Sequence, residues 1–103
     1  MMKYRTDAQL AEILGDDNRW YCSQYYRREI NDPETLARYF CRHGGAINFA
    51  LRWCEAMSET NRYYCGQHYR RQITDERTLW EYYMSQLAAA SDDGGDQREL
   101  SVA

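Results

Sequence analysis

Asn18–Cys41 reads NRWYCSQYYRREINDPETLARYFC, and Asn61–Met84 reads NRYYCGQHYRRQITDERTLWEYYM. The two segments align without a gap at an offset of 43 residues, and 13 of the 24 aligned positions are identical. Because chance does not give such similarity within 103 residues, the chain contains an internal duplication. The duplication predicts a fold with two similar halves and indicates where a binding surface could lie. It contains no motif of a known reaction.

The spacing of apolar residues within the repeat favours a helix over a strand. Cys22, Tyr26 and Ile30 recur at helical intervals, whereas strand alternation would mix polar and apolar residues on both faces. The high content of Trp and Tyr favours the alternative, a strand. We predict helices over residues 19–30 and 62–73, with Asn18 as the N-cap of the first helix, and we keep the strand as the alternative.

A second helix in each copy has a clearer start. The run Asp32-Pro33-Glu34 supplies an N-cap, a proline at the first helical position and an acidic first turn. We predict that this helix runs to about His43, where Gly44-Gly45 breaks it. Asp75 takes the same capping role before a predicted helix over residues 76–90.

Two further helices are predicted outside the repeated segment. Residues 1–7 read as frayed, with Asp7 as the N-cap of a helix over Ala8–Leu14. Ala46–Met57 is apolar nearly all round, which predicts a helix buried on every side. Weak similarity between these two helices extends the repeat to a three-helix unit.

The predicted fold class is therefore all-α. We expect a compact bundle of about six short helices, formed by two duplicated three-helix units with a period of 43 residues. The units would cover about residues 8–43 and 47–90 of a single domain over residues 1–90. The polar, Gly- and Asp-rich segment 91–103 predicts a disordered acidic tail.

Composition excludes several classes of protein. A mean hydropathy of -0.90 excludes a membrane span, and the N-terminus lacks the apolar segment of a secretory signal. The net charge is -3, and without the acidic tail the body is neutral, so the composition is not that of a basic nucleic-acid binder. The four cysteines without a signal peptide predict reduced thiols and a cytoplasmic location.

The two copies separate a predicted core face from a predicted surface face. On a helical wheel, the shared Cys, Tyr and Ile positions face one way, and aromatic, amide and guanidinium groups face the other. Arginine and aromatic side chains anchor interfaces, stack on bases and bind phosphate. The candidate binding residues are Trp20, Tyr21, Gln24, Arg27, Arg28, Tyr63, Tyr64, Gln67, Arg70 and Arg71.

A structural interpretation of the same residues remains open. Arg28 and Arg71 could pair with Asp32 and Asp75, and the tyrosines could pack between the copies. The spacings of Cys and His do not match zinc motifs, and no nucleophile, phosphate loop or acid–base pair stands out. We expect no metal, no cofactor and no catalysis.

The predicted function is that of a small binding protein that presents two repeated aromatic–arginine faces to a protein partner, as an adaptor or an inhibitor. The size is typical of phage and plasmid accessory factors, including those that block host defence. The alternative is nucleic-acid binding through the arginine pairs and the Trp and Tyr rings. A homodimer that buries these faces is a third hypothesis, and no membrane partner is expected.

Overall fold

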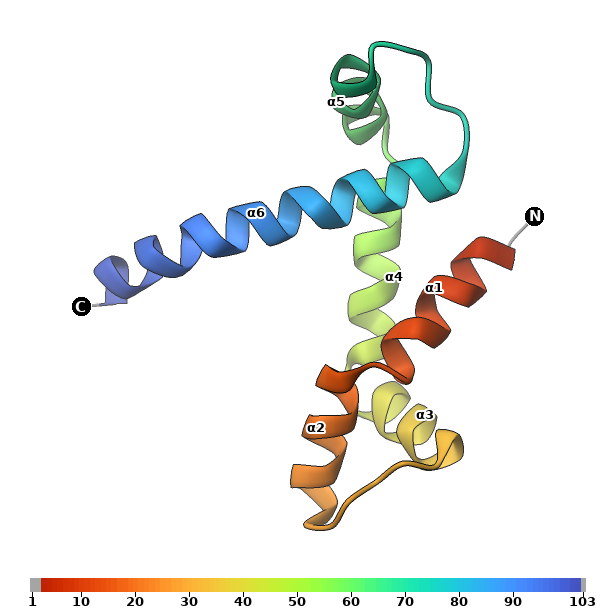
Figure 1. The fold of residues 1–103 in the computed structure, drawn as a ribbon, viewed down its shortest axis with the longest axis vertical. Coiled ribbons are helices and arrows are strands. Elements are labelled where there is room, and N and C mark those ends of the chain that lie inside the picture. Colours follow the sequence, from red (N-terminus) through yellow and green to blue (C-terminus); the bar gives the residue numbers. More distant parts are fainter. Residues whose placement is uncertain (1–2, 103) are drawn as a thin grey trace. The chain divides into compact units, whose positions relative to one another are not determined.

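The computed structural model describes the backbone of residues 3–102 and the side chains of residues 3–90. Within that part of the chain it contains helices and no strand (Figure 1), so the predicted all-α class is confirmed and the strand alternative is wrong. The helices are α1 (Lys3–Ile13), α2 (Asp16–Tyr26), α3 (Pro33–Arg42), α4 (Gly45–Ala56), α5 (Glu59–Tyr69) and α6 (Glu76–Val102). α6 continues through residues 91–102, beyond the predicted helix 76–90, and so covers most of the segment that was predicted to be a disordered tail.

The first helix of each repeat starts and ends earlier than the predicted ranges 19–30 and 62–73. α2 and α5 end at Tyr26 and Tyr69, and Arg27 and Arg70 then adopt the left-handed conformation, each with φ of 58°. In Figure 1 an extended segment follows each of these helices and leads to the next helix. The predicted helices were therefore wrong at both ends, although the helical periodicity was correct.

The burial of Ile30 explains why α2 stops at Tyr26. In an uninterrupted helix, Cys22 and Ile30 would lie about 12 Å apart along the axis, at about 1.5 Å per residue. The structure instead places both side chains in one buried cluster with Leu36. Reversal of the chain at Arg27 makes this packing geometrically feasible.

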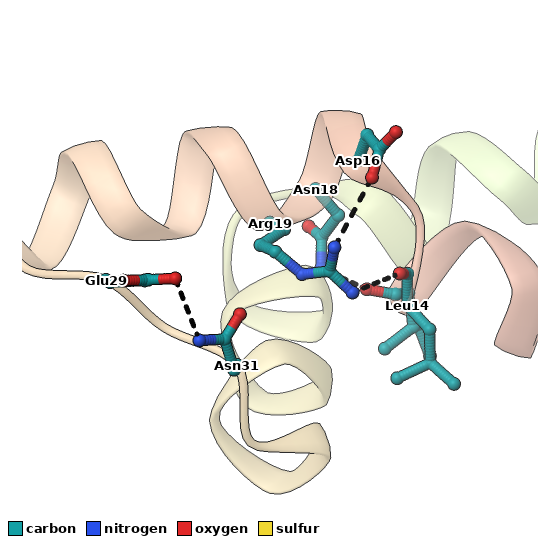
Figure 2. Close-up of polar contacts among 7 residues, drawn as sticks. Leu14, Asp16, Asn18, Arg19, Glu29 and Asn31 are labelled. Carbon is teal, nitrogen blue, oxygen red and sulfur yellow. Dashed lines mark hydrogen bonds and ion pairs between the residues drawn. The ribbon is translucent and has the colours of Figure 1, made fainter.

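Asn18 is not the N-cap of α2, because Gly15 occupies that position without a side-chain hydrogen bond. The Asn18 amide lies in the first turn and donates to the carbonyl oxygens of Ile13, at 2.8 Å, and Leu36, at 3.2 Å. Figure 2 shows this side chain beside Arg19 at the start of α2. Asn18 thereby joins the end of α1 to the start of α3, a role that its sequence position alone did not indicate.

The chain divides into two compact units, Met1–Cys54 and Glu55–Ala103. In the first, the buried cluster contains Cys22, Ile30 and Leu36. The second has a corresponding cluster, which contains Cys65, Ile73 and Leu79.

The second unit also repeats the amide contacts of the first. The Asn61 amide donates to the carbonyl oxygens of Ala56, at 2.7 Å, and Leu79, at 3.2 Å. These partners lie 43 residues after Ile13 and Leu36, the acceptors of Asn18. Equivalent residues of the two copies therefore make equivalent contacts.

The predicted all-round burial of the helix over residues 46–57 is wrong. In α4, Phe49 and Trp53 are buried, but Ile47 is 68% exposed and Leu51 is 63% exposed. Even when every face of a helix is apolar, a face is buried only where another part of the chain packs against it. The side chains on one face of α4 thus form the core, and those on the other face remain accessible.

The N-terminal helix is longer than the predicted Ala8–Leu14. α1 begins at Lys3, so the described part of residues 1–7 is helical and Asp7 lies within the helix rather than at its cap. The Asp7 carboxylate lies 3.9 Å from the Lys3 ammonium, one turn earlier on the helix surface.

The predicted caps of α3 and α6 are confirmed. The Asp32 carboxylate accepts from the Thr35 backbone N–H at 2.9 Å and from its hydroxyl at 2.6 Å, and Pro33 occupies the first position of the helix. Asp75 accepts the same two hydrogen bonds from Thr78, at 2.9 and 2.5 Å. These hydrogen bonds favour the ionised carboxylates and lower the pKa of Asp32 and of Asp75.

A pH dependence of stability follows from these caps. Because the folded-state pKa of each Asp lies below its unfolded value of about 3.9, the caps stabilise the fold above that pH and lose their contribution as the pH falls through the folded-state pKa. Asparagine caps a helix as well as aspartate but does not titrate. We expect the urea midpoint of an Asp32→Asn, Asp75→Asn variant to fall less steeply than that of the wild type between about pH 4 and pH 2. Equal slopes would show that the caps do not contribute to acid unfolding.

Candidate functional site

Every predicted binding residue is exposed: Trp20, Tyr21, Gln24, Arg27, Arg28, Tyr63, Tyr64, Gln67, Arg70 and Arg71. They do not share one helical face, as the wheel suggested, because the four arginines follow the ends of α2 and α5. The left-handed turn at Arg27 and Arg70 redirects the chain there. The ten residues are exposed, but they lie on a helix and in the following loop rather than along one helix face.

Each helix end forms an open groove, and the two grooves have equivalent positions in the two copies. The first is lined by Ser23, Gln24, Arg27, Arg28 and Glu29. The second is lined by the aligned residues, namely Gly66, Gln67, Arg70, Arg71 and Gln72, together with Glu59, Arg62, Tyr63 and Ile73. We call these the first and second arginine grooves. The structure thus brings an amide and two guanidinium groups together twice.

Arg27 and Arg70 are the most informative members of the grooves. A left-handed conformation costs a residue with a Cβ about 1–2 kcal/mol, and glycine is the usual residue at this helix-terminal position. Both copies nevertheless carry arginine there. Within the described residues, neither guanidinium makes a hydrogen bond or an ion pair, so both sets of N–H donors are available to a ligand.

Arg28 and Arg71 form no ion pair with the capping carboxylates, which was the structural alternative, although the charge of each arginine helps to lower the pKa of Asp32 or Asp75. The guanidinium of Arg28 lies over the Tyr26 ring, 5.9 Å from its centre, and that of Arg71 lies 5.8 Å from the centre of the Tyr69 ring. In Asp32 and in Asp75, one carboxylate oxygen, Oδ2, accepts both hydrogen bonds from the threonine. These ring contacts help to hold the two arginines at the grooves, and Arg71 also donates to the Gln72 carbonyl at 3.5 Å.

The exposed aromatic residues form edge-to-face pairs. The rings of Trp20 and Tyr21 have centres 5.0 Å apart, and those of Tyr63 and Tyr64 have centres 5.3 Å apart. All four side chains are between 57% and 61% exposed, so neither pair is packed away inside its unit. Tyr63 lines the second arginine groove, whereas Tyr64 lines a different pocket.

Both grooves carry net positive charge, but to different extents. In the first groove, the Glu29 carboxylate accepts a hydrogen bond from the Asn31 amide at 3.1 Å (Figure 2). In the second groove, glutamine replaces that glutamate and Arg62 adds a further guanidinium, which also donates to the Ile73 carbonyl at 3.1 Å. Planar guanidinium groups bind carboxylates and phosphates in a bidentate manner. The grooves therefore suit anionic groups.

Several groove residues were absent from the predicted set, including Glu29, Glu59 and Arg62. Arg62 aligns with Arg19, and this identity between the two copies could have identified Arg62 as a candidate residue. Arg19 itself donates to the Leu14 carbonyl at 3.1 Å and lies 3.3 Å from an Asp16 oxygen (Figure 2). The equivalent arginines therefore differ in their surroundings.

The cysteines and histidines do not form a recognisable reactive centre. Burial raises the pKa of the Cys22 and Cys65 thiols, which keeps them protonated and weakly nucleophilic. Among the described residues, no three His, Cys, Asp or Glu side chains are placed to share a metal ion. In the same part of the chain, no helix has both the length and the apolar character needed to cross a bilayer.

Comparison of the chain with protein-family models found no match. Comparisons with curated proteins and with solved structures likewise found no match.

Proposed function

We propose that this protein is a non-catalytic binding protein whose two arginine grooves take acidic side chains of a protein partner, so that it acts as an adaptor or an inhibitor. One observation carries the proposal. The same groove occurs at both repeat positions, and in each an arginine without a partner among the described residues occupies a left-handed position that glycine would adopt at lower cost.

The proposal also includes the origin of the two grooves. We infer that the chain arose from two copies of a three-helix unit, α1–α3 and α4–α6. The support is that Asn18 and Asn61 make equivalent bonds and that the two buried clusters use aligned residues. Two grooves in one chain bind a partner that offers two acidic groups more tightly than either groove alone, provided that both are engaged together.

A protein partner is favoured over nucleic acid by charge. Outside the acidic C-terminal segment the chain carries equal numbers of acidic and basic residues, whereas nucleic-acid binders usually have a strongly basic surface. Nucleic acid is the second candidate, because each unit has an arginine pair and two exposed aromatic rings that could stack on bases. The four cysteines form no disulfide, which fits a reducing cytoplasm as the place of action.

The test is affinity capture from a lysate of the source cell, with and without nuclease. The wild type is compared with a Trp20→Ala, Arg27→Ala, Tyr63→Ala, Arg70→Ala variant whose helical circular dichroism is unchanged. We expect a protein that survives nuclease treatment and is lost with the variant, because guanidinium and aromatic anchors dominate binding energies. The purified wild-type chain is then mixed with the purified captured protein to establish direct binding.

A second variant controls for the loss of positive charge. Arg38→Ala, Arg42→Ala removes two exposed arginines of α3 that lie outside the grooves, and it should retain the partner. Equal capture by all three baits would contradict the proposal. Recovery of nucleic acid with a steep salt dependence would support the second candidate instead, and a change only in the elution volume of the purified variant would indicate self-association.

A further inference from the structure

The first unit contains an internal example of guanidinium recognition. Both Nη atoms of Arg52 in α4 lie 2.7 Å from the two carboxylate oxygens of Glu12 in α1. The side chains are 19% and 28% exposed, so the pair is partly shielded from water. Bidentate pairs of this kind are among the stronger charged hydrogen bonds in proteins.

Glu55 is the residue equivalent to Glu12, 43 positions later. Its side chain is exposed and accepts a hydrogen bond from the Tyr83 hydroxyl. Arg52 lies in the second copy of the repeat and is aligned with Gln9, and the position 43 residues after it is Gly95, which lies beyond the aligned segments and has no side chain to supply a guanidinium. The second unit thus keeps the acceptor of the internal ion pair, while the repeat provides no donor for it.

Glu55 lies at a pocket whose other large side chains are aromatic. Tyr64, Tyr82 and Tyr83 line this pocket, together with Ser58, Thr60, Asn61 and Gln86. Neighbouring rings support two of the tyrosines: His68 lies 5.3 Å from Tyr82, and Trp80 stacks 6.4 Å from Tyr83. Aromatic faces attract cations, and the attraction increases where the cation loses some of its water.

We propose that this pocket takes the guanidinium group of an arginine from a protein partner. Glu55 supplies the bidentate acceptor, as Glu12 does for Arg52, and the tyrosine rings contact the planar faces of the cation. The site has the opposite charge preference to the arginine grooves and shares no lining residue with them. Since Tyr63 lines the second groove and Tyr64 lines this pocket, one partner surface with an acidic residue near an arginine would engage both.

Nuclear magnetic resonance titration of the full chain with Nα-acetyl-arginine-N-methylamide tests this site. We expect shifts of the Tyr64, Tyr82 and Tyr83 ring resonances and a Kd on the order of 1–10 mM, as a single cation–π and charged contact should give. The citrulline analogue has the same shape without the charge and should produce no such shifts. Glu55→Gln should weaken binding by at least about tenfold, whereas Glu34→Gln, which removes an exposed carboxylate of the first unit, should not.

A Tyr64→Ala variant, whose replaced side chain is 57% exposed, provides a second test without a change of charge. Equal shifts with arginine and citrulline, or unchanged affinity in both Glu55→Gln and Tyr64→Ala, would overturn the inference. Ring shifts that follow protein concentration alone would assign the arginine to a second copy of this chain and overturn the partner assignment. The Arg27→Gly, Arg70→Gly variant should bind the amide like the wild type, so failure of the arginine grooves and failure of this pocket are distinguishable.

Discussion

Replacing Leu36 by alanine is expected to destabilise the fold by about 2–5 kcal/mol, which is a large part of the 5–15 kcal/mol typical of small domains. Leu36 is fully buried against Cys22 and Ile30, and its backbone carbonyl accepts from the Asn18 amide. Truncation leaves a cavity beside Cys22 and Ile30, and its cost depends on how far the surrounding side chains can relax into it. Urea denaturation followed by circular dichroism measures the loss.

Two further substitutions serve as a comparison and a control for Leu36→Ala. Leu79→Ala removes the aligned leucine from the second cluster and should cost a similar amount, because its neighbours are the aligned residues Cys65 and Ile73. Leu51→Ala makes the same chemical change at a side chain that is 63% exposed and should alter stability by less than about 0.5 kcal/mol. A large loss in Leu51→Ala, or none in Leu36→Ala, would show that the assignment of the core is wrong.

A double variant, Arg27→Gly, Arg70→Gly, is expected to lose about 100-fold or more in affinity for the partner while keeping its stability. Two charged contacts of about 1.5–3 kcal/mol each account for the lost affinity. Glycine relieves about 1–2 kcal/mol of left-handed strain at each position, which offsets the roughly 0.5–1 kcal/mol that its greater freedom in the unfolded chain costs. Denaturation midpoints and titration calorimetry with the purified partner measure the two effects separately.

The matched control for this pair is Arg38→Gln, Arg42→Gln, which removes the same charge from α3. It should bind the partner normally, because neither side chain lines a groove. If the glycine variant is clearly less stable than the wild type, the left-handed arginines contribute contacts to the fold and the strain argument fails. If it is stable and still binds, the grooves are not the binding sites.

The helix starts at Asp32 and Asp75 could be predicted because their signals are local. The carboxylate of an N-cap bonds to a backbone N–H only three residues away, so the order Asp, then Pro or Glu, then Thr is sufficient. The exposure of the ten candidate binding residues was also predicted, since aligned polar and aromatic positions that share no face with the shared Cys and Ile residues tend to be on the surface. Neither inference needs knowledge of distant contacts.

The ends of α2 and α5 could not be predicted in the same way. No glycine follows Tyr26 or Tyr69 to mark a helix end, and the periodic pattern continues as far as Ile30 and Ile73. Chain reversal at these arginines depends on the burial of the two isoleucines against residues of the next helix. The grooves depend on that reversal, and so their shape was not predictable from the wheel.

The sequence by itself determined that this protein is helical, that it contains a duplicated segment, and that its capping aspartates begin the second helix of each copy, because periodicity, alignment and capping are local properties of the chain. Only the tertiary structure decided where α2 and α5 end, which face of α4 is covered, and which side chains meet at the grooves and at the Glu55 pocket. Those outcomes depend on contacts between residues far apart in sequence. At the ends of α2 and α5, the packing of Ile30 and Ile73 into the buried clusters overrode the local helical preference.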